Sequence, residues 1–148
     1  MSQSIFRAYD IRGVYPREIN NEVAYAVGNA VARRLAKRGS RTIIVVGHDA
    51  RTSSFTLYRA VITGIRNYEL GIRRGRGQSK PIIHNSLFII HRAGLITTPM
   101  LYFLVNDLHA DGGVMITASH NPKEWNGFKI VKANAAPVSG KNVRQWIT

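Results

Sequence analysis

A hydroxyl, an imidazole and an amide stand next to one another in residues 117–122, where the sequence reads Thr-Ala-Ser-His-Asn-Pro. The preceding residues, 113–117, form a short apolar run typical of a buried strand, and the Asn-Pro pair turns the chain away. Ser119 is therefore expected at the carboxyl end of a strand, the edge where open α/β sheets hold their ligands. A serine hydroxyl there can act as a nucleophile, with His120 exchanging its proton. These residue types are also common in turns, so the spacing alone leaves a purely structural turn open.

Alternating strand and helix patterns surround this stretch. Residues 42–47 are a nearly continuous β-branched run, the pattern of a strand buried on both faces of a parallel sheet. A helical pattern follows from about Ser54, so the loop between the two elements carries His48, Asp49 and Arg51. This is the strand, loop and helix unit of a layered α/β protein.

Three more helices are indicated by their capping residues. One is predicted after Asn20 and stops at Gly39, one begins with a cap at Thr98, and one opens after Ser139. Extended segments are predicted at residues 4–13, 113–117 and 128–131. Strands that alternate with helices predict an α/β fold, a single three-layer α/β/α domain with a mixed, mostly parallel sheet.

Size and composition set limits on the class of protein. A chain of 148 residues with 45% hydrophobic side chains can form one domain with a core and is too short for two of ordinary size. It contains no cysteine, which excludes disulfides and thiolate metal sites. No apolar stretch approaches the length of a membrane span, and charged residues interrupt the first dozen positions, so we expect a cytoplasmic protein with no membrane partner.

The chain is strongly basic. Its 21 Lys and Arg against 8 Asp and Glu give a formal charge of +13, which attracts partners that carry phosphate. A sugar phosphate and a nucleic acid both fit this description. Basic residues gather in residues 33–41, where cations would stabilise a helix C-terminus, and in residues 73–80, which lack the interleaved aromatic residues of a nucleic-acid site. Charge alone leaves the partner open.

The stretch 117–122 resembles the active-site serine loop of the α-D-phosphohexomutases, the phosphomannomutase/phosphoglucomutase family. Four other segments resemble motifs of that family in the same order, and ordered resemblances of this kind rarely arise by chance. They are residues 6–13 (Phe-Arg-Ala-Tyr-Asp-Ile-Arg-Gly), 46–53 (Val-Gly-His-Asp-Ala-Arg-Thr-Ser), 97–100 (Thr-Thr-Pro-Met) and 126–130 (Asn-Gly-Phe-Lys-Ile). The resemblance implies that residues 4–148 are the family's N-terminal domain I, with its domains II to IV absent.

The family moves a phosphoryl group between the 1- and 6-oxygens of a hexose through a phosphorylated serine, which the resemblance implies is Ser119. It implies that His120 and Lys129 serve proton transfer and charge stabilisation. The implied phosphate- and substrate-binding residues are Arg12, Tyr9 and Asn121, with Asp10 as a further candidate for holding the loop. Each of these also has an ordinary explanation as a turn or surface residue.

The resemblance also implies cofactors and partners. Hexose phosphates would be the substrates, glucose 1,6-bisphosphate or mannose 1,6-bisphosphate the activator, and Mg²⁺ the metal. The family holds Mg²⁺ through a phosphoserine oxygen, here that of Ser119, and an Asp-Gly-Asp-Gly-Asp loop in its second domain. This chain has four aspartates and no such loop. We therefore expect little or no mutase activity from the chain alone, and the remaining domains are candidate partners in trans.

Two regions depart from the family pattern. His48 and Ala50 stand where the family commonly has arginine and glycine, whereas Asp49 and Arg51 are retained and are predicted to pair and brace the serine loop. Residues 68–93 do not resemble the family, and residues 71–81 within them, rich in Arg and Gly, predict a flexible basic loop. Residues 82–90 predict a strand or a short buried segment. An insertion, a divergent surface element and two compensating frameshifts in the gene each explain this block.

Two other functions stay open at this stage. A basic module that binds phosphate or nucleic acid would use the charge of +13 and the Arg-Gly-rich stretch. A non-catalytic interaction fragment would instead pair with separate remaining domains.

Overall fold

The computed structural model describes residues 3–37, 40–75 and 86–147. Its sheet has six strands in the order β1-β5-β4-β2-β3, and β6 pairs with β5. The strands are β1 (Ile11–Val14), β2 (Thr42–His48), β3 (Phe88–Leu95), β4 (Gly112–Ile116), β5 (Trp125–Lys132) and β6 (Pro137–Val138). The helices are α1 (Asn21–Leu35), α2 (Ser54–Gly75), α3 (Thr98–Asp107) and α4 (Gly140–Ile147), with short 3-10 turns η1 (Gln3–Ile5) and η3 (Ala133–Ala135).

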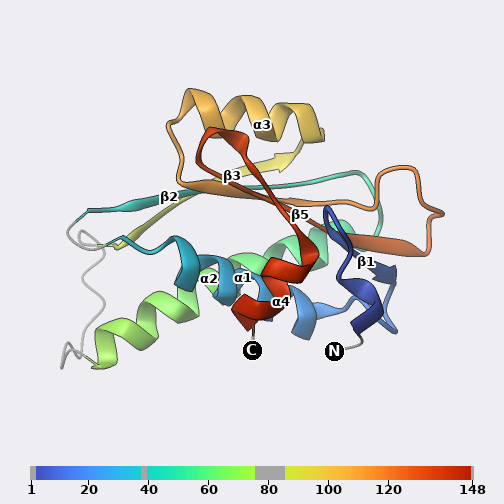
Figure 1. Cartoon of the computed structure of the whole chain (residues 1–148), viewed down its shortest axis with the longest axis horizontal. Coiled ribbons are helices and arrows are strands. Elements are labelled where there is room, and N and C mark those ends of the chain that lie inside the picture. Colours follow the sequence, from blue (N-terminus) through green and yellow to red (C-terminus); the bar gives the residue numbers. More distant parts are fainter. Residues whose placement is uncertain (1–2, 38–39, 76–85, 148) are drawn as a thin grey trace.

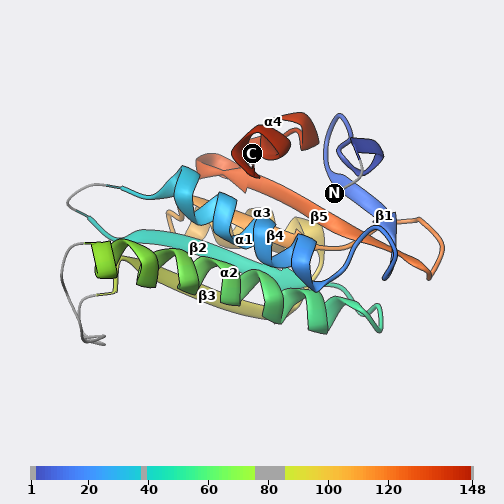
Figure 2. The same cartoon turned by 90° about the horizontal axis from the view of Figure 1, so that it is seen from below.

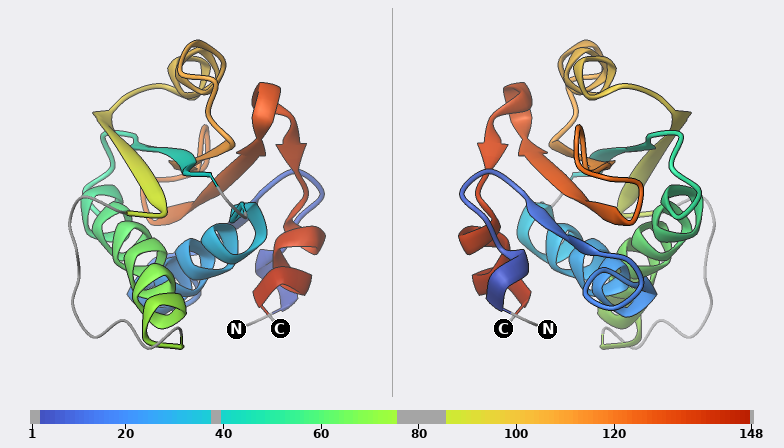
Figure 3. Two further views of the ribbon diagram at one scale, coloured as in Figure 1. Left: turned by 90° about the vertical axis from the view of Figure 1, so that its left-hand side faces the viewer. Right: turned by 90° about the vertical axis from the view of Figure 1, so that its right-hand side faces the viewer.

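The helices cover both faces of the sheet. Helix α3 lies on one face, and α1, α2 and α4 lie on the other (Figure 1). The two end-on views in Figure 3 show the same three layers. The predicted three-layer α/β/α domain is confirmed.

Strand direction divides the sheet into two parts. Strands β3, β2 and β4 are parallel, whereas β4 with β5, β5 with β1 and β5 with β6 are antiparallel. The sheet is therefore mixed, as the sequence predicts, but its parallel part is confined to three strands. The physical reason is the short connection 117–124 between β4 and β5, because a parallel return needs a crossover of a dozen residues or more. The predicted serine loop is that connection.

Alternation along the central strands supplies two hydrophobic cores. Val114 and Ile116 of β4 pack into the core shared with α1 and α2, and Met115 between them packs into the core beneath α3. All three side chains are almost completely buried, as are Val45 and Val46 of β2, which divide in the same way. Both faces of the strand that leads to the serine loop are therefore fixed by packing.

Element ends differ from the predictions in several places. Asn20 caps α1 as predicted, its side chain accepting a hydrogen bond from Val23 N at 3.0 Å. Helix α1 ends at Leu35, earlier than the predicted stop at Gly39, which lies outside the described residues. The cap of α3 is Thr97, one residue before the predicted Thr98, because the Thr97 hydroxyl accepts the hydrogen bond from Met100 N.

The largest local correction concerns the predicted basic loop. Helix α2 continues to Gly75, so residues 71–75 are helical rather than a loop, and residues 76–81 lie outside the described part. The segment 82–90 was predicted as a strand or a buried piece, and β3 begins at Phe88 within it. Residues 4–13 were predicted as extended, but η1 and the bends that follow it precede β1.

Two glycines set the spacing of α1 and α2. A methyl group added to Gly28 would lie 2.1 Å from Val61 O, and one added to Gly64 would lie 2.2 Å from Tyr25 O. We expect Gly28→Ala and Gly64→Ala each to lower the free energy of unfolding by about 2 to 3 kcal/mol, because the helix backbones must separate. Gly71→Ala is the matched control on α2, since nothing lies within 4 Å of its added methyl. That control should be neutral or stabilising by up to about 1 kcal/mol in urea unfolding.

Candidate functional site

Ser119 lies just beyond the carboxyl end of β4, where the sequence placed it. It is exposed, and its φ of 53° puts a non-glycine residue in the left-handed region. Its backbone N donates to the Thr117 hydroxyl at 2.9 Å, and Thr117 N donates to Gly127 O of β5 at 3.0 Å. Left-handed residues of this kind persist where the surroundings hold them, and they gather at functional sites. The loop therefore presents the Ser119 hydroxyl in a fixed place.

Arg51 holds the serine loop by its backbone. Its Nη1 donates to the carbonyl groups of Pro122 at 2.7 Å and Trp125 at 3.1 Å, and its Nη2 donates to those of Ser119 at 2.8 Å and Asn121 at 2.7 Å. Its Nε lies 3.3 Å from Asp49 Oδ2. The guanidinium thus makes four hydrogen bonds to carbonyl groups and one ion pair. The predicted pairing of Asp49 with Arg51 beneath the serine loop is confirmed.

A chain of hydrogen bonds supports that guanidinium from below. Asp49 Oδ1 accepts from the Ser54 hydroxyl at 2.6 Å and from Arg51 N at 3.1 Å. The fully buried Asn126 of β5 donates to the hydroxyls of Ser53 at 2.7 Å and Ser54 at 2.9 Å. The sequence prediction missed Ser54 and Asn126 as site residues. The sequence signal that could have identified Asn126 is its position as an amide within an apolar strand. A buried amide needs hydrogen-bond partners, so it predicts polar side chains nearby.

Asp10 joins the predicted cations into a second network. Arg12 Nε and Nη2 lie 2.7 and 2.6 Å from Asp10 Oδ2, and Lys129 Nζ lies 3.8 Å from the same oxygen. Arg12 Nη1 donates to Asn121 Oδ1 at 2.6 Å. Arg12 faces Gly127 across the antiparallel pair of β1 and β5, so Lys129, two residues on, shares its side of the sheet. The structure therefore brings Arg12, Lys129 and Asn121 together around the Asp10 carboxylate.

The remaining predicted residues divide between exposed and packed positions. His120 is exposed, and its Nδ1 lies 3.4 Å from Ser119 Oγ. Tyr9 is 75% exposed, and Ala50 is exposed at the rim of the groove described below. His48 packs its ring against two aromatic side chains of α2, and its Nδ1 lies 2.8 Å from Asp49 O. His48 therefore joins the start of α2 to the loop that carries Asp49.

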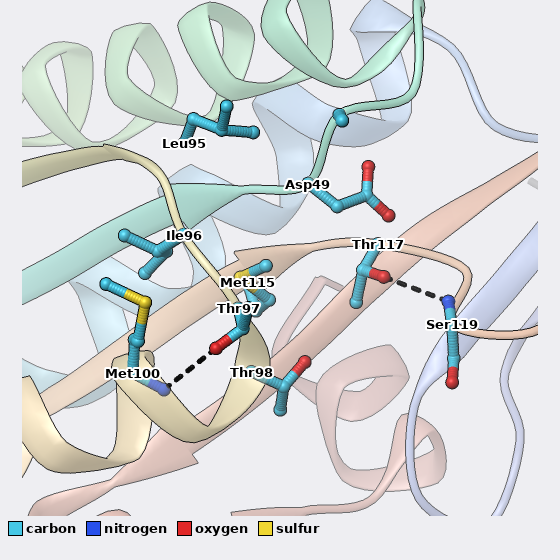
Figure 4. Close-up of a pocket in the computed structure, with 10 residues that line it drawn as sticks. Asp49, Leu95, Ile96, Thr97, Thr98, Met100, Met115, Thr117 and Ser119 are labelled. Atoms are coloured by element: carbon cyan, nitrogen blue, oxygen red, sulfur yellow. Dashed lines mark hydrogen bonds between the residues drawn. The ribbon is translucent and has the colours of Figure 1, made fainter.

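A groove of about 440 Å³ opens beside the serine loop, between the end of β3 and the start of α3 (Figure 4). Ser119, Thr117 and Asp49 line one side, and Thr97 and Met100 line the other. Its size is within the usual range for small-ligand sites. Asp49 is the only charged side chain among its described lining residues, and neither Arg12 nor Lys129 lines it.

The described residues contain no group of three or more His, Cys, Asp or Glu side chains that could hold a metal ion. A hard cation such as Mg²⁺ needs several oxygen ligands. The described side chains therefore do not by themselves form the magnesium site that the family resemblance implies. In the same part of the chain, no helix is long and apolar enough to cross a membrane.

Comparison with protein families fits this geometry. The sequence model described as phosphoglucomutase/phosphomannomutase, alpha/beta/alpha domain I, matches residues 3–75 and 82–148. The chain belongs to the phosphoglucomutase/phosphomannomutase family. The two matched segments leave out only 76–81, so the family pattern extends well into the block 68–93 that was expected to be unmatched.

Curated relatives in the same family carry mutase names. The chain is 37% identical over 139 residues to phosphohexose mutases of Xanthomonas campestris pv. campestris, which covers 94% of the chain and 26% of that protein. It is 38% identical over 130 residues to phosphomannomutase/phosphoglucomutase of Pseudomonas aeruginosa, covering 88% and 24%. The chain thus spans about a quarter of the length of these relatives.

Solved structures of the family share the fold. A phosphoglucomutase/phosphomannomutase family protein of Burkholderia thailandensis superposes with a TM-score of 0.75 at 29% identity, covering 99% of this chain and 29% of that one. A crystal structure titled putative phosphomannomutase, from Thermus thermophilus, gives a TM-score of 0.70 at 29% identity, covering 99% and 30%. The mixed sheet and its helical layers are those of domain I of this family.

Proposed function

We propose that this chain is the serine-bearing domain of a phosphohexomutase, in which Ser119 carries the phosphoryl group exchanged with hexose phosphates. The observation that carries the proposal is the exposed Ser119 hydroxyl, held on a left-handed residue whose carbonyl is clamped by Arg51. The four hydrogen bonds from Arg51 to carbonyl groups of this loop keep the solvent-facing serine in one position. The names of the relatives support hexose phosphates as the substrate class.

The proposed chemistry is a pair of phosphoryl transfers. In the first, the bond between phosphorus and Ser119 Oγ breaks as a bond forms from phosphorus to a hydroxyl oxygen of the hexose phosphate, and the proton of that hydroxyl passes to Ser119 Oγ. In the second, the other phosphoryl group of the resulting bisphosphate moves to Ser119: its bond to the sugar oxygen breaks, a bond forms from phosphorus to Ser119 Oγ, and the serine proton passes to that sugar oxygen. The hexose phosphate is thereby isomerised between its 1- and 6-oxygens, and glucose or mannose 1,6-bisphosphate is the intermediate.

Three side chains have proposed roles in these steps. His120 lies close enough to Ser119 Oγ to exchange the proton, because imidazole can gain and lose one near neutral pH. Arg12 and Lys129, oriented by Asp10, stabilise the negative charge that spreads over the transferred group. Asn121 fixes the position of Arg12 relative to the serine loop, and exposed Tyr9 is a proposed contact to substrate. Mg²⁺, when bound to the phosphoserine with ligands from elsewhere, would neutralise part of this charge.

We also propose that the chain by itself has little or no mutase turnover. The resemblance assigns the aspartate ligands of the metal to the family's second domain, and the described residues supply no substitute for them. The proposed result is phosphate exchange on the serine without release of isomerised product. Domains supplied in trans would restore turnover.

The test is phosphate uptake from radiolabelled glucose 1,6-bisphosphate in the presence of Mg²⁺, followed by peptide mapping. We expect label on the peptide that contains Ser119 and none in Ser119→Ala. Ser40→Ala removes another exposed hydroxyl and should leave the labelling unchanged. Absence of label, or label that persists in Ser119→Ala, would contradict the proposal.

A further inference from the structure

A second groove, of about 340 Å³, lies between α2 and the edge strand β3, which run beside each other in Figure 2. Three arginines, Arg59, Arg66 and Arg92, line it together with the aromatic side chains of Phe55 and Tyr58. None of these residues belongs to the serine loop or to the network around Asp10. The groove is therefore separate from the candidate active site.

The arginines place positive charge on both walls of the groove. Arg59 and Arg66 are seven residues apart on α2, which puts them on one face of the helix two turns apart, and Arg92 faces them from β3. No carboxylate is among the described lining residues, and none of the three forms an ion pair within the described ranges. Three guanidinium groups around one hollow favour an anion with more than one phosphate.

The aromatic side chains add a flat apolar surface at one end. The rings of Phe55 and Tyr58 are nearly parallel, at an interplanar angle of 20° with centroids 6.2 Å apart, and His48 packs against both. Tyr58 is buried, whereas Phe55 is 55% exposed and offers a free face. Burial raises the pKa of the Tyr58 phenol, and the nearby Arg92 and a backbone hydrogen bond at Gly94 oppose this only in part. Tyr58 therefore stays neutral and does not cancel the positive charge.

Size and order along the helix indicate the ligand class. Phe55 and Arg66 are eleven positions apart, about 16 Å along α2, and the volume of the groove is near the lower limit of small-ligand sites. A planar ring at one end and phosphates along the rest describe one nucleotide rather than a sugar phosphate. We propose that this groove binds a nucleoside diphosphate or triphosphate, with the base on Phe55 and the phosphates on Arg59, Arg66 and Arg92.

The test compares ADP, pyrophosphate and single-stranded poly-dT as calorimetric ligands of the full chain. Phe55→Ala should lower the affinity for ADP about fivefold or more and leave the affinity for pyrophosphate unchanged, because only the base loses its stacking surface. Arg66→Gln should lower the affinity for both ligands about tenfold or more. The matched controls are Phe103→Ala, an exposed aromatic side chain of α3 on the other face of the sheet, and Arg33→Gln, an exposed arginine of α1. Both controls should bind ADP as the unchanged chain does.

Three results would overturn the proposal. The first is no measurable binding of ADP to the unchanged chain, in a preparation whose cooperative thermal unfolding shows that it is folded. The second is an equal loss of ADP affinity in Phe55→Ala and Phe103→Ala, which would show that the base does not stack on Phe55, or an equal loss in Arg66→Gln and Arg33→Gln, which would show attraction to the general positive charge. The third is binding of poly-dT without binding of ADP, which would make the surface a nucleic-acid site. None of these outcomes bears on phosphate uptake by Ser119.

Discussion

Arg51→Lys should slow phosphate uptake by Ser119 about 100-fold, even though the positive charge is kept. The guanidinium donates to four carbonyl groups between residues 119 and 125, and a single ammonium cannot reach four acceptors in different directions. The left-handed backbone at Ser119 then loses the contact at its own carbonyl and relaxes. A shift of about 1 Å in a reacting atom is enough for a rate loss of this order.

The measurement is the rate of label transfer from glucose 1,6-bisphosphate to each variant, beside urea unfolding of the same preparations. Arg17→Lys, at an exposed arginine before α1, is the matched control and should transfer label at the unchanged rate. We expect the free energy of unfolding of Arg51→Lys to fall by about 1 to 3 kcal/mol, since several charge-assisted hydrogen bonds are lost. If Arg51→Lys loses this much stability but transfers label at the rate of the unchanged chain, Arg51 has no role in positioning the serine.

Local pattern was sufficient to predict most elements and the place of the serine. Two apolar runs, the β-branched residues 42–47 and the residues before 117, predict strands that are packed on both faces. The structure has both strands. The capping residue Asn20 likewise predicts the start of α1, because its side chain accepts a hydrogen bond from a backbone N only three residues away. Such features depend on near neighbours in the chain, so a single sequence carries them.

The balance of strand directions and the supporting network depend on contacts between distant residues. The prediction of a mostly parallel sheet did not weigh that the connection 117–124 is too short for a crossover. Asn126 and Ser54 are 72 positions apart and meet only because β5 pairs with β4 beside the start of α2. The loop predicted for residues 71–75 was likewise wrong, because long side chains such as Arg favour helix although their polarity resembles that of a loop.

Asp10→Asn tests whether the cations near the serine act as a positioned set. Two effects oppose each other: removing the carboxylate makes the surroundings more positive, which favours phosphate, and it frees Arg12 and Lys129 from their common partner. The first effect is at most about 4 kcal/mol near a protein surface, whereas the two contacts that Arg12 loses with Asp10 Oδ2 together contribute about 3 to 6 kcal/mol. Loss of orientation should therefore exceed the gain in attraction.

We expect Asp10→Asn to slow label transfer to Ser119 about tenfold or more and to lower the free energy of unfolding by about 2 to 4 kcal/mol, because a nearly buried counter-charge is lost from Arg12. Asp107→Asn, at the end of α3, removes an equal charge from an exposed position and should change neither quantity. The decisive comparison is inorganic phosphate affinity against transfer rate. Tighter phosphate binding with slower transfer would establish positioning, and faster transfer would show that Asp10 only offsets charge.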